Sequence, residues 1–321
     1  MRIGLLNNLR AGRSDAQVTR LLGYLRHHPD VVHVETDQAH AVPEALGDLA
    51  RQDVELLVVN GGDGTLEYVL SQILAHQAFE DRLPLIAPLR GGRTNMTALD
   101  LGVQRDPLKA LASLIEAARG NQLQAHIVDR PVLHVEHGPS TARESVYGMF
   151  FGLGMIHRAI ELVHRMMPKG HQGVFGATVV TGALVGRSAF GDSQGVLTPD
   201  KVQILLDGQA AEHGEFSCVI SSTLHRLFAR MRPFWGEGPG RLRFTGVAAG
   251  STHKVRAFSG ILRGAPNPEL ATPENGYTSH NVDRAELRFD CGFTIDGELF
   301  PPSPGQVVTL STDSSIRFVR A

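Results

Sequence analysis

A glycine-rich turn joins an apolar run to a helical pattern in the first quarter of the chain. Residues Glu55–Asn60 read Glu-Leu-Leu-Val-Val-Asn, and Gly61-Gly62-Asp63-Gly64-Thr65 follow directly. A continuous apolar run predicts a parallel strand that is covered on both faces. Because Leu66–His76 then shows a helical pattern, the segment predicts a strand, a tight turn and a helix, as in a parallel α/β sheet.

Similar patterns alternate through the first third of the chain. The expected strands are Ile3–Leu6, Val31–Val34 and Pro84–Pro88, and the expected helices are Asp15–His27, Val42–Leu49 and Pro107–Arg119. This alternation predicts a parallel α/β nucleotide-binding domain over residues 1–125.

The pattern changes after residue 125, where short alternating runs are separated by glycine and proline. The runs that we expect to be strands are Val132–Glu136, Val202–Leu206, Phe216–Ile220, Arg241–Val247, Lys254–Phe258, Ala285–Phe289, Gly292–Ile295 and Val307–Leu310. Helical patterns interrupt them at His157–Met167 and Phe175–Val185. The sequence therefore predicts a β-rich, β-sandwich-like domain over residues 126–321, with a cleft between the two domains.

Composition narrows the class of protein. A net charge of −2 over 321 residues gives no argument for nucleic acid binding. Cys218 and Cys291 are too few for a disulfide framework, which favours a reduced, cytoplasmic compartment. No stretch approaches the roughly 20 apolar residues that a membrane helix needs. We expect a soluble protein that can still touch the inner face of a membrane.

The turn Gly61–Thr65 predicts a phosphate site. Its three glycines let the backbone approach a ligand closely, and the amides and dipole at a helix start favour phosphate. The Asp63 carboxylate beside phosphates is unfavourable unless it holds a metal or handles a proton. The open alternative is an ordinary strand-to-helix turn in which Asp63 caps the helix.

The turn resembles that of the diacylglycerol kinase catalytic domain family, which includes sphingosine, ceramide and bacterial lipid kinases. NAD kinases and phosphofructokinases carry a related turn. Two further segments favour the first family: Asn8-Leu9-Arg10-Ala11-Gly12, and the stretch Pro88–Gly102 with Gly92, Thr94 and Asn95. The sequence departs from the family at Leu9, where the family has proline, and at Arg93, where it has threonine.

A third match is Asp296-Gly297-Glu298, which resembles the family's Asp-Gly-Glu. Taken alone, an Asp-Gly pair between two β-runs predicts a hairpin turn. The resemblance implies that Glu298 is the general base for the acceptor hydroxyl. At Glu237-Gly238 bacterial members have an Asp-Gly that binds a structural magnesium, and with glutamate here we expect no bound metal.

The resemblance implies an ATP-dependent lipid kinase that phosphorylates diacylglycerol or a similar lipid and uses Mg²⁺. Asp63 and Glu298 are the implied catalytic residues, and Asp63 is also the candidate metal ligand. The implied nucleotide-binding residues are Asn8, Gly12, Thr36, Gly61, Gly62, Gly64, Thr65, Gly92, Thr94 and Asn95. Two alternatives stay open: an NAD kinase-like enzyme with a soluble substrate, and a nucleotide- or lipid-binding relative without turnover.

Contact with lipid needs a surface. Leu224–Trp235 mixes arginines at 226, 230 and 232 with large apolar residues, including Trp235, the only tryptophan of the chain. Such a mixture suits an anionic membrane interface, while the alternative is a loop packed on the core with solvated arginines. We expect a lipid substrate, peripheral membrane contact and no nucleic acid, and a homodimer stays open.

Overall fold

The computed structural model describes residues 1–9, 15–37, 39–80, 82–139, 142–166 and 195–321. Their contacts form two compact units, which we call unit 1 (Met1–Arg130 with Ser315–Ala321) and unit 2 (Pro131–Ser314). Among the described residues, no helix is long and apolar enough to cross a bilayer.

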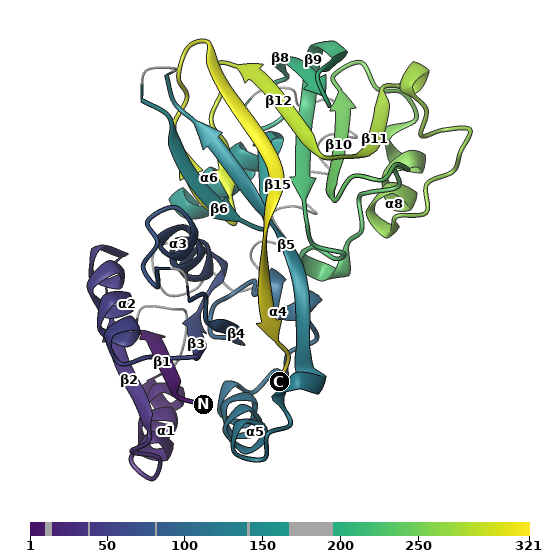
Figure 1. Cartoon of the computed structure of the whole chain (residues 1–321). Coiled ribbons are helices and arrows are strands. Elements are labelled where there is room, and N and C mark those ends of the chain that lie inside the picture. Colours follow the sequence, from purple (N-terminus) through teal and green to yellow (C-terminus); the bar gives the residue numbers. More distant parts are fainter. Residues whose placement is uncertain (10–14, 38, 81, 140–141, 167–194) are drawn as a thin grey trace. The chain divides into compact units, whose positions relative to one another are not determined.

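Unit 1 contains a parallel sheet with the strand order β2-β1-β3-β4 (Figure 1). Its strands are β1 (Ile3–Asn8), β2 (Val31–Thr36), β3 (Leu56–Gly61) and β4 (Leu85–Arg90). The residues of β3 are all buried, as a run without polar alternation requires in a sheet that is covered on both faces. The predicted parallel α/β architecture is confirmed.

Helices cover both faces of this sheet. Figure 1 shows α2 and α3 on one side of the strands, and α1 and α5 on the other. The helices of unit 1 are α1 (Asp15–Leu25), α2 (Val42–Arg51), α3 (Asp63–Leu74), α4 (Met96–Asp100) and α5 (Pro107–Arg119), with 3₁₀ turns η1 (Ala39–Ala41) and η2 (Leu123–His126). Helix α5 begins and ends where the sequence predicts, because Pro107 occupies its first turn and Asp106 caps it by accepting from the Leu108 amide at 2.9 Å.

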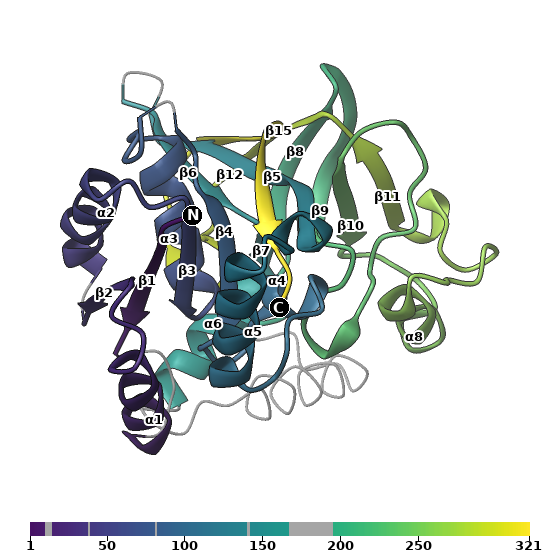
Figure 2. The same cartoon turned by 60° about the horizontal axis from the view of Figure 1, so that its bottom comes forward.

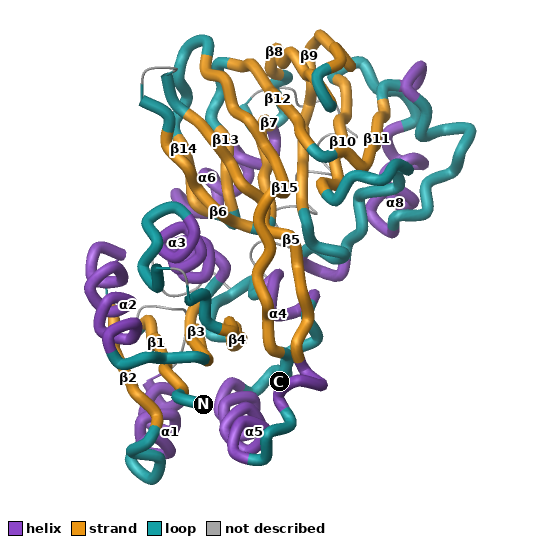
Figure 3. Tube along the Cα trace, in the orientation of Figure 1, coloured by secondary structure: helices purple, strands orange, loops and turns teal. Residues whose placement is uncertain are grey.

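Unit 2 is built from antiparallel strand pairs, and Figure 3 shows its strands in orange. Its strands are β6 (Glu144–Gly148), β7 (Phe150–Gly154), β8 (Asp200–Leu206), β9 (Gln209–Ser222), β10 (Leu242–Ala248), β11 (Tyr277–Val282), β12 (Arg284–Phe289), β13 (Phe293–Ile295) and β14 (Glu298–Phe300). Strands β5 (Ile127–His137) and β15 (Gln306–Val319) belong partly to unit 1 and partly to unit 2. Its helical segments are α6 (Met155–Met166), α8 (Lys254–Arg263), η3 (Phe228–Arg230) and η4 (Pro273–Asn275). The predicted β-rich character of this region is confirmed.

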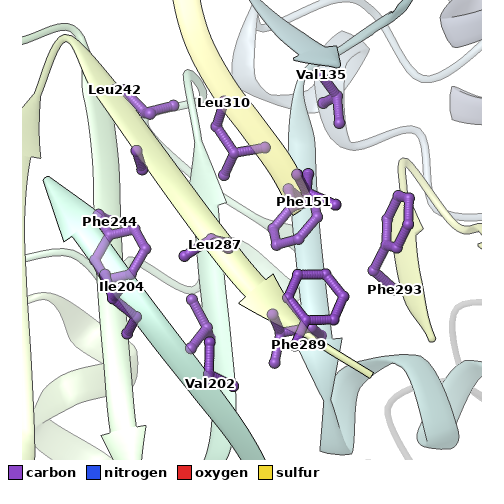
Figure 4. Close-up of a cluster of buried hydrophobic side chains, with 14 of the residues drawn as sticks. Val135, Phe151, Val202, Ile204, Leu242, Phe244, Leu287, Phe289, Phe293 and Leu310 are labelled. Atoms are coloured by element: carbon purple, nitrogen blue, oxygen red, sulfur yellow. The ribbon is translucent and has the colours of Figure 1, made fainter. Parts of the chain in front are cut away.

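The core of unit 2 is an aromatic and aliphatic cluster (Figure 4). Phe151 and Phe293 are fully buried, with ring centroids 5.6 Å apart, and Phe293 stacks on Phe300 at 4.6 Å. Aromatic rings at these separations add stabilisation beyond the area that they bury. The cluster holds β7 against β13, which begins the hairpin that carries Glu298.

The last residues of the chain pack in unit 1. Phe318 at the end of β15 pairs in parallel with Ile86 of β4, and the Arg320 amide donates to the His126 carbonyl at 3.0 Å. Figure 2 shows the C-terminus beside α5. The sequence assigned these residues to the second domain, because an alternating run does not reveal which sheet its strand joins.

One predicted strand is wrong. Lys254–Phe258 belongs to helix α8, although its short run of alternating residues has a period of two. Over the full segment, Ala257 and Ile261 are buried and stand four residues apart, which is the spacing of one helix face. The predicted helix at His157–Met167 is observed as α6, while Phe175–Val185 lies outside the described residues.

Candidate active site

The candidate site of unit 1 lies at the carboxyl ends of β1 and β3. The chain runs from β1 outward to β2 and then returns past β1 to β3, so the strand order reverses between these neighbours. Open α/β sheets bind ligands at the carboxyl ends of the strands where such a reversal occurs. Asn8 and the turn Gly61–Thr65 follow the two strands at this point.

The turn opens directly into α3. Gly62 is the N-cap residue in an extended conformation, and no side chain caps the helix there. The amides of the first helical turn have no carbonyl within the helix to bond, and the helix dipole makes this end positive. The turn therefore has the backbone donors that a phosphate group needs.

Side chains tie this turn to its neighbours. Asn8 Nδ2 donates to Thr65 Oγ1 at 2.8 Å, which joins the end of β1 to the start of α3. The side chain of Thr65 also covers Gly61, where an added Cβ would lie only 2.5 Å from Thr65 Cβ. Any side chain at position 61 would therefore displace Thr65 from the turn.

A second glycine loop packs against the first. Gly92, in the loop after β4, lies so close to Gly62 that an added Cβ would be 2.2 Å from Gly62 Cα. Asn95 holds this loop, since its Oδ1 accepts from the Gly92 amide at 2.7 Å and its Nδ2 donates to the Gly92 carbonyl at 2.8 Å. The structure thus brings together Gly61, Gly62, Gly92 and Asn95.

The remaining predicted nucleotide residues differ in exposure. Gly64 and Thr94 are half-buried. Thr36, at the end of β2, is 2% exposed, and its Oγ1 has no hydrogen-bond partner. It lies beside Leu9, the residue after Asn8, because the Leu9 amide donates to the Thr36 carbonyl at 2.8 Å. Gly12 lies outside the described residues.

Asp63 has an environment that the sequence did not predict. It is 8% exposed, and its carboxylate accepts from the backbone amides of Met96 at 2.9 Å and Thr97 at 3.2 Å. Burial raises its pKa, while hydrogen bonds from the amides oppose this rise. The aspartate is indeed a helix cap, but the helix that it caps is α4 and not the one that contains it.

A buried amide pair was also missed. Asn60 Nδ2 donates to Asn7 Oδ1 at 2.6 Å between the ends of β3 and β1, and both residues are 1% exposed. The signal was present in the sequence, because each apolar run ends in asparagine. This pair joins the ends of the two strands that Asn8 and the glycine turn follow.

In unit 2, Asp296-Gly297 forms the two-residue turn between β13 and β14. Both residues have positive φ (48° and 96°), as this type of hairpin turn requires. Asp296 is buried, and its Oδ2 accepts from the Met149 amide at 2.8 Å. Glu298, the first residue of β14, is exposed to solvent. The turn thus separates a buried carboxylate from an exposed one.

The described residues contain no group of three or more His, Cys, Asp or Glu side chains arranged to hold a metal ion. Both carboxylate oxygens of Asp63, the candidate metal ligand, accept from backbone amides, one from Met96 and the other from Thr97.

Comparison with known proteins agrees with this architecture. Residues 2–125 match the family model of the diacylglycerol kinase catalytic domain. No curated protein matches the sequence. A solved diacylglycerol kinase from Bacillus anthracis str. Sterne is 17% identical, with a TM-score of 0.62 over 100% of this chain and 97% of that one. Yeast NADH kinase, solved with NADH, is 11% identical, with a TM-score of 0.52 over 100% and 84% of the chains.

At these identities the solved structures establish a shared fold, and the family model supports a kinase. The resemblance that the sequence motifs predict is confirmed: residues 2–125 match the diacylglycerol kinase catalytic domain family.

Proposed function

We propose that the chain is an ATP-dependent lipid kinase that transfers the γ-phosphoryl group to a hydroxyl of diacylglycerol or a similar lipid. The observation that carries this proposal is the pair of glycine loops, Gly61-Gly62 and Gly92, packed together where the strand order of the sheet reverses. The family match over residues 2–125 supports the same reading.

Phosphoryl transfer depends on positioning and on neutralising charge more than on covalent help from the protein. The amides at the start of α3 are the proposed donors to the ATP phosphates. Because Asn8 holds Thr65 and Asn95 holds Gly92, the backbone of both loops is fixed before the nucleotide arrives. Binding energy is then not spent on ordering the loops.

Glu298 is the proposed general base. A base must reach the acceptor hydroxyl and be ionised when it does so. The Glu298 side chain is exposed, and its backbone is held because its carbonyl accepts from Thr294 Oγ1 at 2.7 Å. Asp63 does not meet the first need, since it is buried and bonded to α4.

The segment Leu224–Trp235 supports lipid contact through its arginines. Arg226, Arg230 and Arg232 are exposed, whereas Leu224 and Leu227 are buried. Trp235 packs against the small cluster of Ala257 and Ile261. The segment therefore offers a cationic surface to anionic lipid, while its apolar side chains stabilise unit 2.

An NAD kinase-like function is the second candidate, and the fold shared with yeast NADH kinase favours it. Binding without turnover is the third, and the departures at Leu9 and Arg93 are what favour it.

One assay separates the three functions. The protein is incubated with labelled ATP in parallel reactions, each of which contains diacylglycerol, monoacylglycerol, sphingosine or NAD. Glu298→Gln is the inactive control. Label on a lipid supports the proposal, and label on NAD alone supports the second candidate. ATP binding without transfer to any acceptor would leave only the third.

A further inference from the structure

The carboxylate of Asp63 connects two helices that are distant in sequence. Asp63 is the first residue of α3, while its hydrogen bonds go to the amides of Met96 and Thr97, the first two residues of α4. The amide of Asn95 adds a further interaction with the same carboxylate. Asp63 is therefore the N-terminal cap of α4, supplied from another helix.

Helix α4 has no side-chain cap of its own. Its N-cap residue, Asn95, is in the left-handed conformation with φ 50°, and its side chain makes no capping hydrogen bond. That side chain instead closes on Gly92. A helix of five residues is too short to hold its first turn by cooperativity alone, so the cap from Asp63 decides whether this turn is formed.

These contacts form a closed circuit. Asp63 accepts from the first amides of α4, and Asn95 precedes this helix. The Asn95 side chain bonds Gly92, and Gly92 packs against Gly62, the residue before Asp63. Each step is a contact of the backbone or of a side chain with the backbone, so a shift in one loop moves the other. The carboxylate sets the distance between the two glycine loops.

A catalytic or metal-binding role explains these observations less well. A metal ion at this carboxylate would face the positive end of the α4 dipole, which is unfavourable for a cation. A proton acceptor must be reachable by the substrate hydroxyl, yet Asp63 is 8% exposed. The amide donors, in contrast, are the partners that a buried carboxylate needs.

We propose that Asp63 is a positioning residue, which fixes the Gly92–Asn95 loop over the Gly61-Gly62 turn by capping α4, and does not bind metal or take up the substrate proton. This proposal rests on the proposed function, because the two loops are the proposed nucleotide site. It assigns the aspartate of the turn an effect on ATP affinity that is transmitted through Asn95 and Gly92.

The test compares Asp63→Asn, Asp63→Ser and Asp63→Ala with Glu67→Gln. Asparagine and serine keep one oxygen acceptor for the α4 amides, whereas alanine keeps none. Glu67 is the matched control, since it is another buried carboxylate on α3, and its Oε1 accepts from Ser71 of the same helix. Amide hydrogen exchange without nucleotide and the Kd for ATP are measured for each, together with the KM for ATP, kcat and the Mg²⁺ requirement where the unmodified chain shows turnover.

We expect Met96 and Thr97 to exchange about tenfold faster in Asp63→Ala, with smaller effects in Asp63→Asn and Asp63→Ser, while β3 stays protected. In Asp63→Ala the KM for ATP should rise about tenfold or more, whereas the Mg²⁺ concentration that gives half the maximal rate should change by less than about twofold. Glu67→Gln should leave all of these as in the unmodified chain.

Two results would overturn the proposal. One is unchanged exchange at α4 in every Asp63 variant. The other is a tenfold or larger rise in the Mg²⁺ requirement, by the same kinetic measure, without a change in ATP affinity. Exchange and ATP binding need no acceptor, so they test this proposal even if the unmodified chain phosphorylates neither lipid nor NAD, which would refute the proposed function alone.

Discussion

Asn95 binds both backbone groups of Gly92, accepting from its amide at 2.7 Å and donating to its carbonyl at 2.8 Å. These two hydrogen bonds, which we call the clip, hold the second glycine loop. Asn95 also has a φ of 50°, a left-handed conformation that asparagine tolerates better than most residues. Asparagine meets both requirements, since its side chain can both donate and accept hydrogen bonds and its backbone tolerates a positive φ.

Replacing Asn95 should therefore separate two effects. Asn95→Ala removes the clip and strains the backbone by about 1 kcal/mol, whereas Asn95→Gly removes the clip without strain. We expect both variants to raise the KM for ATP by about ten- to a hundredfold, because a displaced loop misplaces the nucleotide. Thermal unfolding should show a loss for both variants, because both remove the hydrogen bonds to the Gly92 amide and carbonyl, and the strain adds to the loss in Asn95→Ala. Unchanged ATP affinity in Asn95→Gly would show that the clip does not matter for binding.

A methyl group at Gly92 should separate the two glycine loops. The added Cβ would lie 2.2 Å from Gly62 Cα, and backbone cannot yield as a flexible side chain can. Gly92→Ala should cost about 1–3 kcal/mol of unfolding free energy and reduce ATP binding about tenfold or more. Urea unfolding and calorimetric titration with ATP measure these two losses.

The matched control for Gly92→Ala is Gly23→Ala in α1. An added Cβ at Gly23 meets nothing within 4 Å, and alanine is favoured over glycine in a helix by about 0.8–1 kcal/mol. This variant should gain stability and bind ATP as before. A gain or no change at Gly92 as well would contradict the close packing of the loops.

The sequence predicted the elements of unit 1 well, because each buried strand is a continuous apolar run and each helix has a regular period. The residues of Glu55–Asn60 and Pro107–Arg119 illustrate this, since burial alone decides their pattern. Lys254–Phe258 failed because five residues are too few to distinguish a period of two from one of 3.6. The partner of Phe318 was not predictable either, since strand pairing depends on the whole fold.

The candidate site was predictable as a set of residues but not as a set of contacts. The glycines and Asn95 were identified because their spacing matches a family motif. That Asp63 caps α4 could not be read from sequence, because its partners are more than thirty residues away and are backbone amides. Any residue type can supply a backbone amide, so such contacts leave no signal in the sequence.

The two acids of the β13–β14 hairpin should respond differently to mutation. Glu298 is exposed, so Glu298→Gln should change the unfolding free energy by less than about 0.5 kcal/mol. If it is the general base, transfer to the acceptor should fall by about 10²–10⁴-fold. Labelled-ATP assays and thermal unfolding together check both statements, and transfer at the unmodified rate would exclude the base.

Asp296→Ala, unlike Glu298→Gln, should lower the free energy of unfolding. Its carboxylate is buried and accepts from the Met149 amide at 2.8 Å, so removing it leaves that donor unpaired. An unpaired buried donor costs about 1–3 kcal/mol, which chemical denaturation can resolve. A stability equal to that of Glu298→Gln would mean that the hydrogen bond contributes nothing.

The exposed arginines of Leu224–Trp235 should control binding to anionic vesicles. Replacing Arg226, Arg230 and Arg232 together by alanine removes three cations, each contributing about 1 kcal/mol near an anionic surface. Co-sedimentation with phosphatidylglycerol vesicles should therefore fall. Added salt should likewise weaken vesicle binding by the unmodified protein. Binding that survives the triple replacement would exclude this segment.

The control for the arginine variant removes equal charge elsewhere. Arg51, Arg82 and Arg119 are exposed and belong to unit 1, so their replacement by alanine lowers the net charge by the same amount. Equal loss of vesicle binding in both triple variants would show that only net charge matters.

Buried histidine should make the fold sensitive to mild acid. His157, in the first turn of α6, is 7% exposed, and burial is the largest cause that lowers its pKa. The Arg158 guanidinium also lowers it, while Glu161, Asp200 and a hydrogen bond with the Phe300 backbone partly oppose the shift. The imidazole is therefore neutral in the folded chain at a pH where the unfolded chain already binds a proton.

The sign follows from proton linkage. A histidine whose folded pKa is lowered contributes stability that is complete above the unfolded pKa of about 6.5 and is lost as the pH falls toward the folded pKa. Each unit of difference corresponds to about 1.4 kcal/mol. The same direction holds for His33 and His137, whose pKa values are also lowered by burial.

Urea unfolding between pH 8 and pH 5 should therefore show stability falling below about pH 6.5. His157→Gln, which stays neutral, should reduce this slope without abolishing it, because His33 and His137 still contribute. His280→Gln on the exposed face of β11 is the control and should keep the full slope. If His157→Gln and His280→Gln gave the same slope, burial of the His157 ring would not be the source of the acid sensitivity.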